Sequence, residues 1–378
     1  MTNQQSAASN ETASGGLLDV VVIGGGQAGL AMAWHLAQRG LEFVVLEAGP
    51  ELGHVWRNRW DSLKLFTPAQ YSSLPGRPFP APAPADTYPT RDAVADYLQA
   101  YAKRFDLPVA LNARVTDLRR VEDCFEVRTG DALYRTRQVV IATGPFQAPF
   151  TPPVAGTLDP AVTQVHSAAY RNPQALPDGP VLVVGGGNSG FQIAEELAAG
   201  RQVDLSIGAR YPMLAQRLLG RDLFWWLNRF GLMRLNADSR LGRRVRSRGE
   251  FIIGTHRRRL ERAGVRFRPR LVGAQGRTVR FADGSTLDVT TVIWATGFRP
   301  DYSWIHIPGV IDDGRIVHRR GVSVVPGLYF LGLSWQHTRG SALLGFVQDD
   351  AGYLADRITA VEPAAAPPPA AVERHPAT

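Results

Sequence analysis

Residues 17–29 read LLDVVVIGGGQAG, in which an apolar run leads directly into a cluster of glycines. The run from Leu17 to Ile23 predicts a buried parallel strand, because such strands are apolar on both faces. A helical pattern follows from Leu30 to Arg39, and a second apolar run extends from Phe43 to Leu46. The order strand, glycine turn, helix, strand is the unit that binds dinucleotides, so these residues predict an α/β fold with a parallel sheet.

The residues of this first glycine turn (residues 24–29) have separate roles in binding a dinucleotide. Gly24 allows the tight turn, Gly26 lets the backbone approach a pyrophosphate, and Gly29 lets the helix pack closely on the strand. Gln27 and Ala28 lie in the turn just before the helix, whose free N–H groups and positive dipole end face the phosphates. We therefore expect these five residues to bind a cofactor.

An acidic residue ends the second strand of the same unit. Glu47 lies 18 positions past Gly29, where a carboxylate accepts hydrogen bonds from ribose hydroxyls. A carboxylate at this position disfavours a 2′-phosphate. The first unit is therefore predicted to bind FAD or NAD rather than NADP.

The same order recurs later in the chain. A strand from Val181 to Val184 leads into a second glycine turn (residues 185–190), and a helix from Phe191 to Ala199 and a strand from Val203 to Ile207 follow. We expect this unit to bind a second dinucleotide through Gly185, Gly187, Asn188, Ser189 and Gly190.

The end of the second unit differs from the end of the first. Gly208 lies 18 positions past Gly190 in place of an acid, and Arg210 follows two residues later. Loss of the carboxylate and gain of a guanidinium is the change that a 2′-phosphate requires, which predicts NADPH at this site. Arg217 and Arg221 are rival ligands for the phosphate, and Arg210 as an ordinary surface arginine is the alternative interpretation.

Two sites of opposite charge preference predict hydride transfer from NADPH to a flavin, with FAD in the first site. A reduced flavin passes electrons to a disulfide, a quinone, a protein or oxygen. Cys124 is the single cysteine, so the chain has no cysteine pair for the dithiol route. Oxygen, a small acceptor or a partner protein remains. A flavin-binding sensor without catalysis is the alternative from another class.

Composition limits the partners. The 378 residues carry a net charge of +8 and show neither a signal-peptide pattern nor an apolar run of about 18 residues, so we predict a cytoplasmic protein without stable membrane insertion. Thirteen arginines lie between Arg234 and Arg270. They form either a patch for nucleic acid or acidic membrane, or a solvated face that also attracts a polyanionic cofactor. No nucleic-acid motif accompanies them, so we expect no nucleic-acid partner, and no metal site is expected; homo-oligomerisation stays open.

Several stretches resemble the single-component (class B) flavin monooxygenases. They include two ATG-type segments and the aromatic half of the family signature after Gly156, and they extend over about Leu17 to Ile358: Ile141–Gly144, Ile293–Phe298, His166–Tyr170, Trp56–Pro68, Tyr88–Arg91 and Ser341–Phe346. Within that superfamily the chain resembles the bacterial CzcO-like branch, which is related to the plant YUCCA enzymes. The resemblance implies an FAD- and NADPH-dependent enzyme that acts on a small organic substrate and O2.

The resemblance also implies a glutathione-reductase-like architecture of two Rossmann-like domains. We expect an FAD domain in two chain segments, residues 17–172 and 296–360, with an NADPH domain inserted at residues 173–295. Residues 1–16 and the Ala/Pro-rich residues 361–378 are predicted to be disordered tails. The apolar stretch Leu223–Leu227 is interpreted as a helix buried between the domains, with a membrane or tunnel role as the alternative.

In this family NADPH reduces FAD, and oxygen adds to the flavin as a C4a-(hydro)peroxide that oxygenates nitrogen, sulfur or a carbonyl. The residues expected at the cofactors by this resemblance are Trp56, Arg57, Thr143 and Gly144 for FAD, and Ala295, Thr296 and Gly297 for NADPH and the link between the domains. His166 is expected to link the domains rather than to act as a base.

One position departs from the family. Animal-type members carry an Asn after the segment that corresponds to Ser62-Leu63, and that Asn supports the peroxyflavin; here residues 64–66 are Lys, Leu and Phe. Asn58, Asn188 or retained NADP⁺ takes over this role, or the oxygen adduct decays. Decay makes the chain an NADPH oxidase or diaphorase that releases peroxide.

Overall fold

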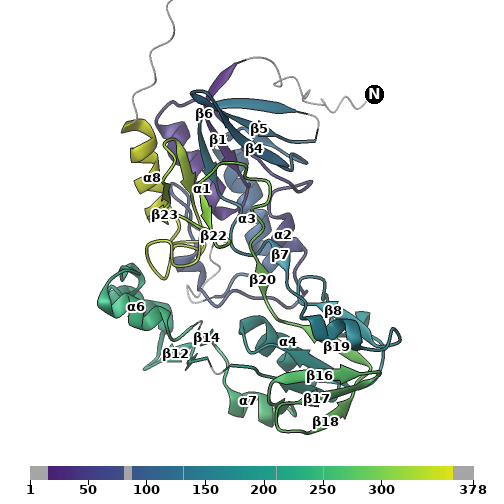
Figure 1. Ribbon diagram of the computed structural model, residues 1–378. Helices are drawn as coiled ribbons and strands as arrows, with labels where there is room; N and C mark the ends of the chain where they lie inside the picture. Colours follow the sequence, from purple (N-terminus) through teal and green to yellow (C-terminus); the bar gives the residue numbers. More distant parts are fainter. Residues whose placement is uncertain (1–15, 81–86, 131, 210, 250, 361–378) are drawn as a thin grey trace, which may run out of the picture.

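The computed structural model describes residues 16–80, 87–130, 132–209, 211–249 and 251–360. Nearly all of both predicted tails, part of the Pro-rich stretch from Pro75 to Pro89, and Arg210 lie outside the described residues. Two separate sheets with helices packed on them lie one above the other (Figure 1). The expected α/β fold with two Rossmann-type units is confirmed.

The first sheet contains both strands of the first dinucleotide unit. In the described part of the chain its nine strands are β1 (Leu17–Ile23), β2 (Phe43–Leu46), β3 (Val109–Ala110), β4 (Asp117–Val121), β5 (Cys124–Arg128), β6 (Leu133–Ile141), β23 (His318–Arg319), β24 (Val322–Ser323) and β25 (Leu328–Phe330). Strands β3, β2, β1, β6 and β25 are neighbours in that order and all parallel. The C-terminal strand β25 therefore returns to the sheet that the N-terminus begins.

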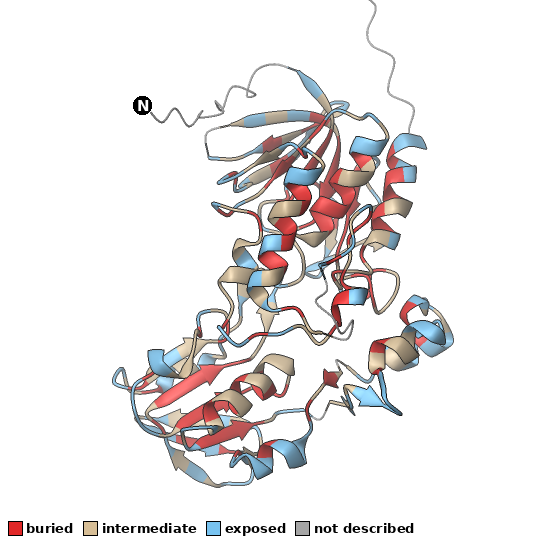
Figure 2. Ribbon diagram, turned by 180° about the vertical axis from the view of Figure 1, so that it is seen from behind, coloured by how far each residue is buried: buried red, intermediate tan, exposed pale blue. Residues whose placement is uncertain are grey.

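Alternate residues of β1 supply two different cores. Val20 and Val22 pack with helices α1 (Gln27–Gln38), α3 (Arg91–Arg104) and α8 (Gln348–Ala360), whereas Val21 and Ile23 pack with the β4–β5 hairpin. All four side chains are buried, as the unbroken apolar run requires. The buried strands lie between these two layers (Figure 2).

The second sheet repeats this plan. Its described strands, all parallel, are in order β15 (Arg266–Arg268), β10 (Val203–Ser206), β9 (Val181–Val184), β19 (Thr291–Trp294) and β8 (Thr163–His166). One face packs on α4 (Asn188–Ala198) and α7 (Arg257–Arg262), and the other packs on the antiparallel strands β16 (Leu271–Gln275), β17 (Thr278–Phe281) and β18 (Thr286–Asp288). The predicted domain boundary at residue 172 stays a prediction; β8 precedes it and pairs in this sheet.

Two short antiparallel strands connect the halves. Strand β7 (Ala148–Pro149) leaves the first sheet, and β20 (Phe298–Arg299) returns from the second. Smaller elements on the first half are α2 (His54–Arg57), η1 (Ala69–Tyr71), β21 (Ile311–Asp312) and β22 (Arg315–Ile316), whereas η2 (Pro153–Thr157) and η3 (Pro173–Ala175) lie on the second half. Because each glycine turn precedes the first helix of its own sheet, the two turns belong to different halves of the molecule.

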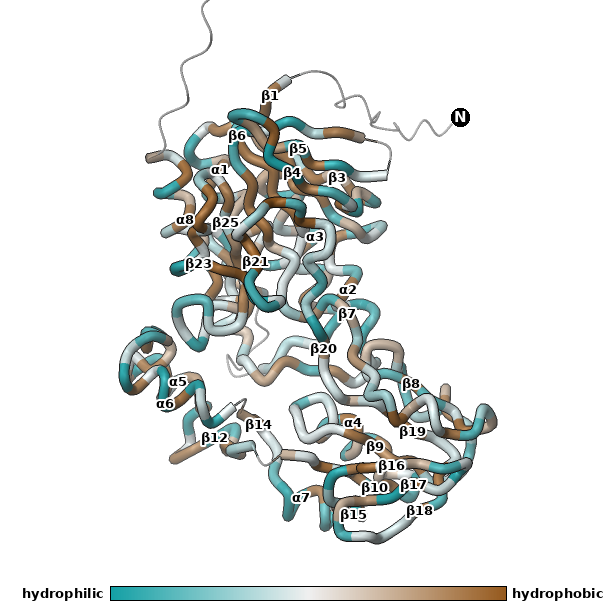
Figure 3. Tube along the Cα trace, in the orientation of Figure 1, coloured by the Kyte–Doolittle hydropathy of each residue, from teal (hydrophilic) through white to brown (hydrophobic). Residues whose placement is uncertain are grey.

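Residues 211–249, which we call the basic lobe, project from the second sheet between β10 and β15 (Figure 1). The lobe consists of β11 (Met213–Leu214), β12 (Arg217–Leu218), β13 (Arg221–Asp222), α5 (Leu223–Arg229), η4 (Leu232–Arg234) and α6 (Arg240–Arg246), and β11 pairs with β14 (Ile252–Ile253). Hydrophobic and hydrophilic residues alternate along it (Figure 3). The expected helix at 223–227 forms, but in it only Phe224 is buried.

Candidate active site

The backbone of the first glycine turn excludes side chains at two positions and leaves space at a third. A Cβ on Gly24, where φ is +109°, would lie 2.7 Å from the carbonyl oxygen of Ala142. A Cβ on Gly29 would lie 1.8 Å from the carbonyl oxygen of Gly24. Around Gly26, by contrast, no described atom lies within 4 Å of that position. The space beside Gly26 is therefore open to a ligand.

The second glycine turn has the same stereochemistry. A Cβ would lie 2.1 Å from the oxygen of Ala295 at Gly185 and 2.1 Å from the oxygen of Gly185 at Gly190. No described atom lies within 4 Å of a Cβ on Gly187. Since open space recurs beside the middle glycine of both turns, both turns have room for a pyrophosphate against the backbone.

The helices that follow these turns lack a side-chain cap that four other helices have. Thr90, Asp222, Ser239 and His256 cap α3, α5, α6 and α7, each with a side chain that accepts a hydrogen bond from the backbone. Neither α1 nor α4 has a side-chain cap. Their N–H groups and positive dipole ends are thus left for an anion. This arrangement fits a dinucleotide pyrophosphate at each helix.

The carboxylate of Glu47 lies beside the first turn. Its Oε2 accepts a hydrogen bond of 2.8 Å from the N–H of Gly25, and its Oε1 accepts one of 2.7 Å from the N–H of Gly49. These bonds fix the carboxylate at the end of β2 without saturating it, because each carboxylate oxygen can accept a second hydrogen bond. The fixed carboxylate fits a ribose with free hydroxyls.

An arginine that the sequence analysis did not predict lies beside the corresponding end of β10. The guanidinium of Arg270 donates a hydrogen bond of 3.0 Å to the carbonyl oxygen of Gly208. Arg270 follows β15, which pairs parallel with β10, and Arg268 two residues earlier bonds Asp204 of β10 at 2.7 Å. The strand order 3-2-1 of a Rossmann unit was the signal that places the end of β15 beside Gly208.

The two rival arginines lie on the β12–β13 hairpin. Arg217 donates to the carbonyl of Gly220 at 2.8 Å, and Arg221 lies 5.3 Å from the ring centroid of Trp225. Arg210 lies outside the described residues. Among the described candidates, Arg270 is therefore the arginine placed against the end of β10.

Both candidate catalytic amides are bonded to other protein groups. The side chain of Asn58 donates to the carbonyl of His54 at 3.0 Å and accepts from Arg171 at 2.8 Å. The side chain of Asn188 donates to the carbonyl of Phe251 at 2.9 Å and accepts from the N–H of Ile253 at 3.0 Å. Each amide therefore joins two segments of the chain through hydrogen bonds, and neither amide has both of its N–H donors free.

Trp56 and Arg57 point in different directions. Trp56 packs against the main core of each sheet, so it lies where the two halves meet. Arg57 instead bonds Asp96 of α3 at 2.5 Å and lies within 3.6 Å of Asp92. These acidic partners raise the pKa of Arg57, and they hold its charge on the outside of α3. The geometry favours Trp56 over Arg57 as a group facing a cofactor.

The two ATG-type segments meet at the connecting strands. Gln147 donates hydrogen bonds to the hydroxyl of Thr143 at 2.8 Å and to the carbonyl of Gly144 at 2.9 Å. The hydroxyl of Thr296 donates to the carbonyl of Phe150, and Gly297 accepts from the N–H of Phe150 at 2.9 Å. These bonds tie the ends of β6 and β19 to the crossing point. Ser189 and Ala295 lie in the second unit, at the start of α4 and the end of β19.

His166 also bonds to this crossing point. Its Nδ1 accepts from the N–H of Ala168 at 3.1 Å, which leaves Nε2 to donate to the carbonyl of Gly297 at 3.0 Å. Burial is the main cause that lowers the pKa of His166, so the ring is neutral. A neutral ring with both nitrogens bonded acts as a link between segments.

Arg59 lies beside His166 and carries a charge that no described carboxylate neutralises. Its guanidinium lies 5.0 Å from the ring centroid of Phe298, which contacts His166. Burial and the neighbouring Arg171 lower the pKa of Arg59. A desolvated guanidinium of this kind is a binding group for an anionic part of a ligand.

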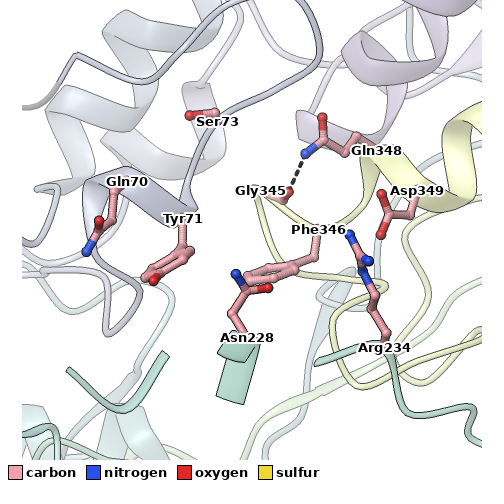
Figure 4. A pocket seen from close by; sticks show the side chains of 9 residues that line it. All are labelled: Gln70, Tyr71, Ser73, Asn228, Arg234, Gly345, Phe346, Gln348 and Asp349. Carbon is pink, nitrogen blue, oxygen red and sulfur yellow. Dashed lines mark hydrogen bonds between the residues drawn. The ribbon is translucent and has the colours of Figure 1, made fainter. Parts of the chain in front are cut away.

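A cavity of about 180 Å³ lies between the basic lobe and the first half of the molecule. Tyr71 and Phe346 line it from the first half, and Asn228 and Arg234 line it from the lobe (Figure 4). Asp349 approaches Arg234 in the same view. The cavity combines aromatic, amide and charged groups from both halves of the molecule.

Several known proteins are similar to this chain. The family described as pyridine nucleotide-disulphide oxidoreductases matches residues 21–211. An uncharacterised CzcO-like oxidoreductase of Geobacillus kaustophilus is 46% identical over 90% of this chain and 98% of its own length. The indole-3-pyruvate monooxygenase YUCCA1 of Oryza sativa subsp. japonica is 30% identical over 87% of this chain and 86% of its own.

A solved structure matches over nearly the same length. The flavin-containing monooxygenase from Stenotrophomonas maltophilia superimposes with a TM-score of 0.75 at 30% identity, covering 91% of this chain and 98% of that chain. The match includes both sheets, because it extends over more than either half alone.

Proposed function

Since this chain belongs to the single-component flavin monooxygenase family, in its CzcO-like branch, we propose that it uses NADPH and O2 to oxygenate a small organic substrate at nitrogen, sulfur or a carbonyl carbon. The chain is an oxidoreductase whose cofactors are FAD and NADPH. Bound NADPH would supply a hydride and bound FAD would supply O2 activation, so that one oxygen atom would enter the substrate and the other would leave as water. For the oxygen-transfer step we propose the mechanism that the resemblance to flavin monooxygenases implies.

The observation that carries the proposal is the pair of uncapped helices behind open glycine turns. Helices α1 and α4 each present an anion site, and the two sites lie on different sheets. Glu47 at the first and Arg270 at the second give the two sites opposite charge preferences. The two sites therefore suit two different cofactors, with FAD as the hydride acceptor at the first turn and NADPH as the reductant at the second.

The domain division is part of the proposal. We propose an FAD domain in two chain segments with the NADPH domain inserted between them. Because β8 pairs in the second sheet, we place the first joint at β7, before the predicted boundary at residue 172. The crossing strands β7 and β20 and the bonds of His166 to Gly297 support a joint at this place.

Cysteine chemistry favours oxygen as the electron acceptor. Although the family description names a disulphide, Cys124 is the single cysteine of this chain, so the chain has no pair to cycle between dithiol and disulfide. Cys124 also lies on β5, whose side chains pack on the face of the first sheet opposite α1.

A second function is favoured by one observation. The amides of Asn58 and Asn188 are both engaged by protein groups, so neither replaces the family Asn without breaking those bonds. An NADPH oxidase or diaphorase that releases peroxide is therefore the second candidate. A non-catalytic sensor is the third, and it requires negligible turnover.

The test of the proposed function is the coupling of NADPH use to product. The purified yellow protein is supplied with NADPH and with an amine, a sulfide or a ketone, while NADPH, O2, peroxide and product are measured together. A monooxygenase shows less peroxide per NADPH with a true substrate than without it, with oxygenated product making up the difference. One peroxide per NADPH with every compound contradicts the proposal and identifies an oxidase.

Cofactor choice gives a second prediction. Arg270→Ala removes the guanidinium beside Gly208 and should raise the KM for NADPH by about tenfold to a hundredfold, because a charge-assisted bond to phosphate is worth roughly 1.5–3 kcal/mol. The KM for NADH should stay within about twofold, because NADH lacks the 2′-phosphate.

Two further variants are needed to interpret the result with Arg270→Ala. Arg258→Ala removes an exposed arginine of α7 and serves as the matched control. Arg210→Ala tests the arginine expected from the sequence. Equal effects of Arg270→Ala on NADPH and NADH would contradict its assignment, and a selective effect of Arg210→Ala alone would transfer the role to Arg210.

A further inference from the structure

The basic lobe (residues 211–249) concentrates the positive charge of the chain. It contains nine arginines and two aspartates, a net charge of +7, whereas the whole chain has +8. The arginines of α6 and the residues just after it are exposed: Arg240, Arg243, Arg244, Arg246 and Arg248. The rest of the molecule is therefore close to neutral, and the lobe presents a localised cationic surface.

The same lobe exposes large apolar side chains. Of the thirteen exposed large hydrophobic residues in the described chain, six lie in the lobe. Leu219 is 82% exposed, Phe230 65% and Leu218 54%, and Leu232, Leu241 and Met213 complete the set. Scattered single apolar residues are ordinary on a surface, but this concentration in one small projection marks an interaction site.

Direct contacts join several of these side chains into one surface. The indole N–H of Trp226 donates to the carbonyl of Leu218 at 2.9 Å, and the ring of Trp226 stacks on Phe230 with centroids 5.9 Å apart. Trp225 packs edge-on against Trp226 at 4.7 Å, and Arg221 lies over Trp225. Leucine, indole and guanidinium groups are thus contiguous.

The backbone conformation at the tip of the β12–β13 hairpin lowers the stability of the folded protein. Leu219 and Gly220 form the two-residue turn with φ values of +48° and +75°. Turns of this kind favour Asn-Gly, because a branched side chain at positive φ is strained. Leu219 gains little packing in return, since most of its surface is exposed. A strained, exposed leucine at a projecting tip points to a role in contact with something outside the chain.

We propose that the basic lobe binds the surface of a bilayer that contains anionic lipids. Leu218, Leu219 and Phe230 supply apolar groups that enter the interfacial region, and the arginines bind lipid phosphates. Indole rings such as Trp225 and Trp226 favour that same boundary. The attachment is peripheral, and no described helix is long and apolar enough to cross a bilayer.

Charge and apolar exposure select this occupant over two others. A second copy of the chain in a twofold contact would place the same +7 surface against itself, which is repulsive. A nucleic acid would satisfy the arginines but would leave the exposed leucines without an apolar environment. Asn228 and Arg234 of the lobe also line the cavity of Figure 4, so a docked lobe holds that cavity close to the lipid surface.

The test is sedimentation of the FAD-loaded protein with vesicles of phosphatidylcholine alone and with vesicles that also contain phosphatidylglycerol. Binding should occur to the anionic vesicles and fall as salt is raised. Leu219→Asn should weaken it about tenfold, because one leucine side chain leaves the interface. Asparagine suits a positive φ, so the FAD content and melting temperature of this variant should not fall. Leu111→Asn, which changes a leucine that is 43% exposed outside the lobe, is the matched control and should bind as the parent does.

Charge is tested with Arg243→Gln/Arg244→Gln against Arg258→Gln/Arg262→Gln, which lie on α7 outside the lobe. The first pair should lose binding to anionic vesicles and the second pair should keep most of it. Equal binding to both kinds of vesicle, or to neither, overturns the proposal. A concentration-dependent dimer that Leu219→Asn abolishes overturns the proposal in favour of a second copy of the chain. Tight DNA binding without vesicle binding overturns it in favour of a nucleic acid.

Discussion

Gly26→Val is expected to give a folded protein that purifies without FAD. Gly26 has φ −76° and ψ −171°, an extended conformation that valine adopts without strain, and no described atom lies within 4 Å of its Cβ position. The Cβ of the added side chain therefore meets no described atom, and the isopropyl group fills the space beside the start of α1. Loss of about two charge-assisted hydrogen bonds to a pyrophosphate, worth roughly 3 kcal/mol, should weaken FAD binding at least about a hundredfold.

Flavin absorbance per protein measures this effect, and the melting temperature measures folding. Because bound FAD itself stabilises the fold, the variant is compared with parent protein stripped of flavin. Gly200→Val is the matched control, since its Cβ position is equally open but lies beyond the far end of α4. A yellow Gly26→Val variant with full flavin content would mean that the pyrophosphate does not lie against this turn.

The parts of the site that depend on backbone geometry could be predicted from the sequence. The order of strand, turn and helix determines which glycine approaches its own neighbours, and Gly29 and Gly190 meet the carbonyls of Gly24 and Gly185 as that order requires. The apolar runs of β1 and β9 likewise predicted strands buried on both faces. These features are local, since they join residues only a few positions apart.

The bonding partners of long polar side chains could not be predicted in this way. Arg57 follows Trp56 in sequence, yet its partners are acids of α3, a helix more than thirty residues later. Asn58 is occupied by Arg171, a partner 113 positions away. Arg270 reaches Gly208 only because β15 pairs with β10. Each contact depends on how distant elements are placed, and no spacing along the chain reports that placement.

Gly187→Val should produce the opposite phenotype, a yellow protein that NADPH no longer reduces efficiently. Gly187 has φ −88° and ψ 180°, and its Cβ position is open, so valine is tolerated by the fold as at Gly26. The second turn lies on the other sheet from the first, so FAD content should match that of the parent. Flavin reduction at low NADPH concentration should fall at least about a hundredfold, from the same loss of phosphate hydrogen bonds.

Anaerobic mixing with NADPH, followed by flavin absorbance, measures that rate. Dithionite should reduce variant and parent alike, because it does not need the second turn, and Gly200→Val should behave as the parent with both reductants. Normal reduction by NADPH would place the nicotinamide cofactor elsewhere and separate the two halves of the proposed reaction. Loss of flavin together with loss of reduction would instead mean that α4 supports the FAD site across the joint. The two valine variants thus assign each cofactor to its own turn, because each leaves the other turn intact.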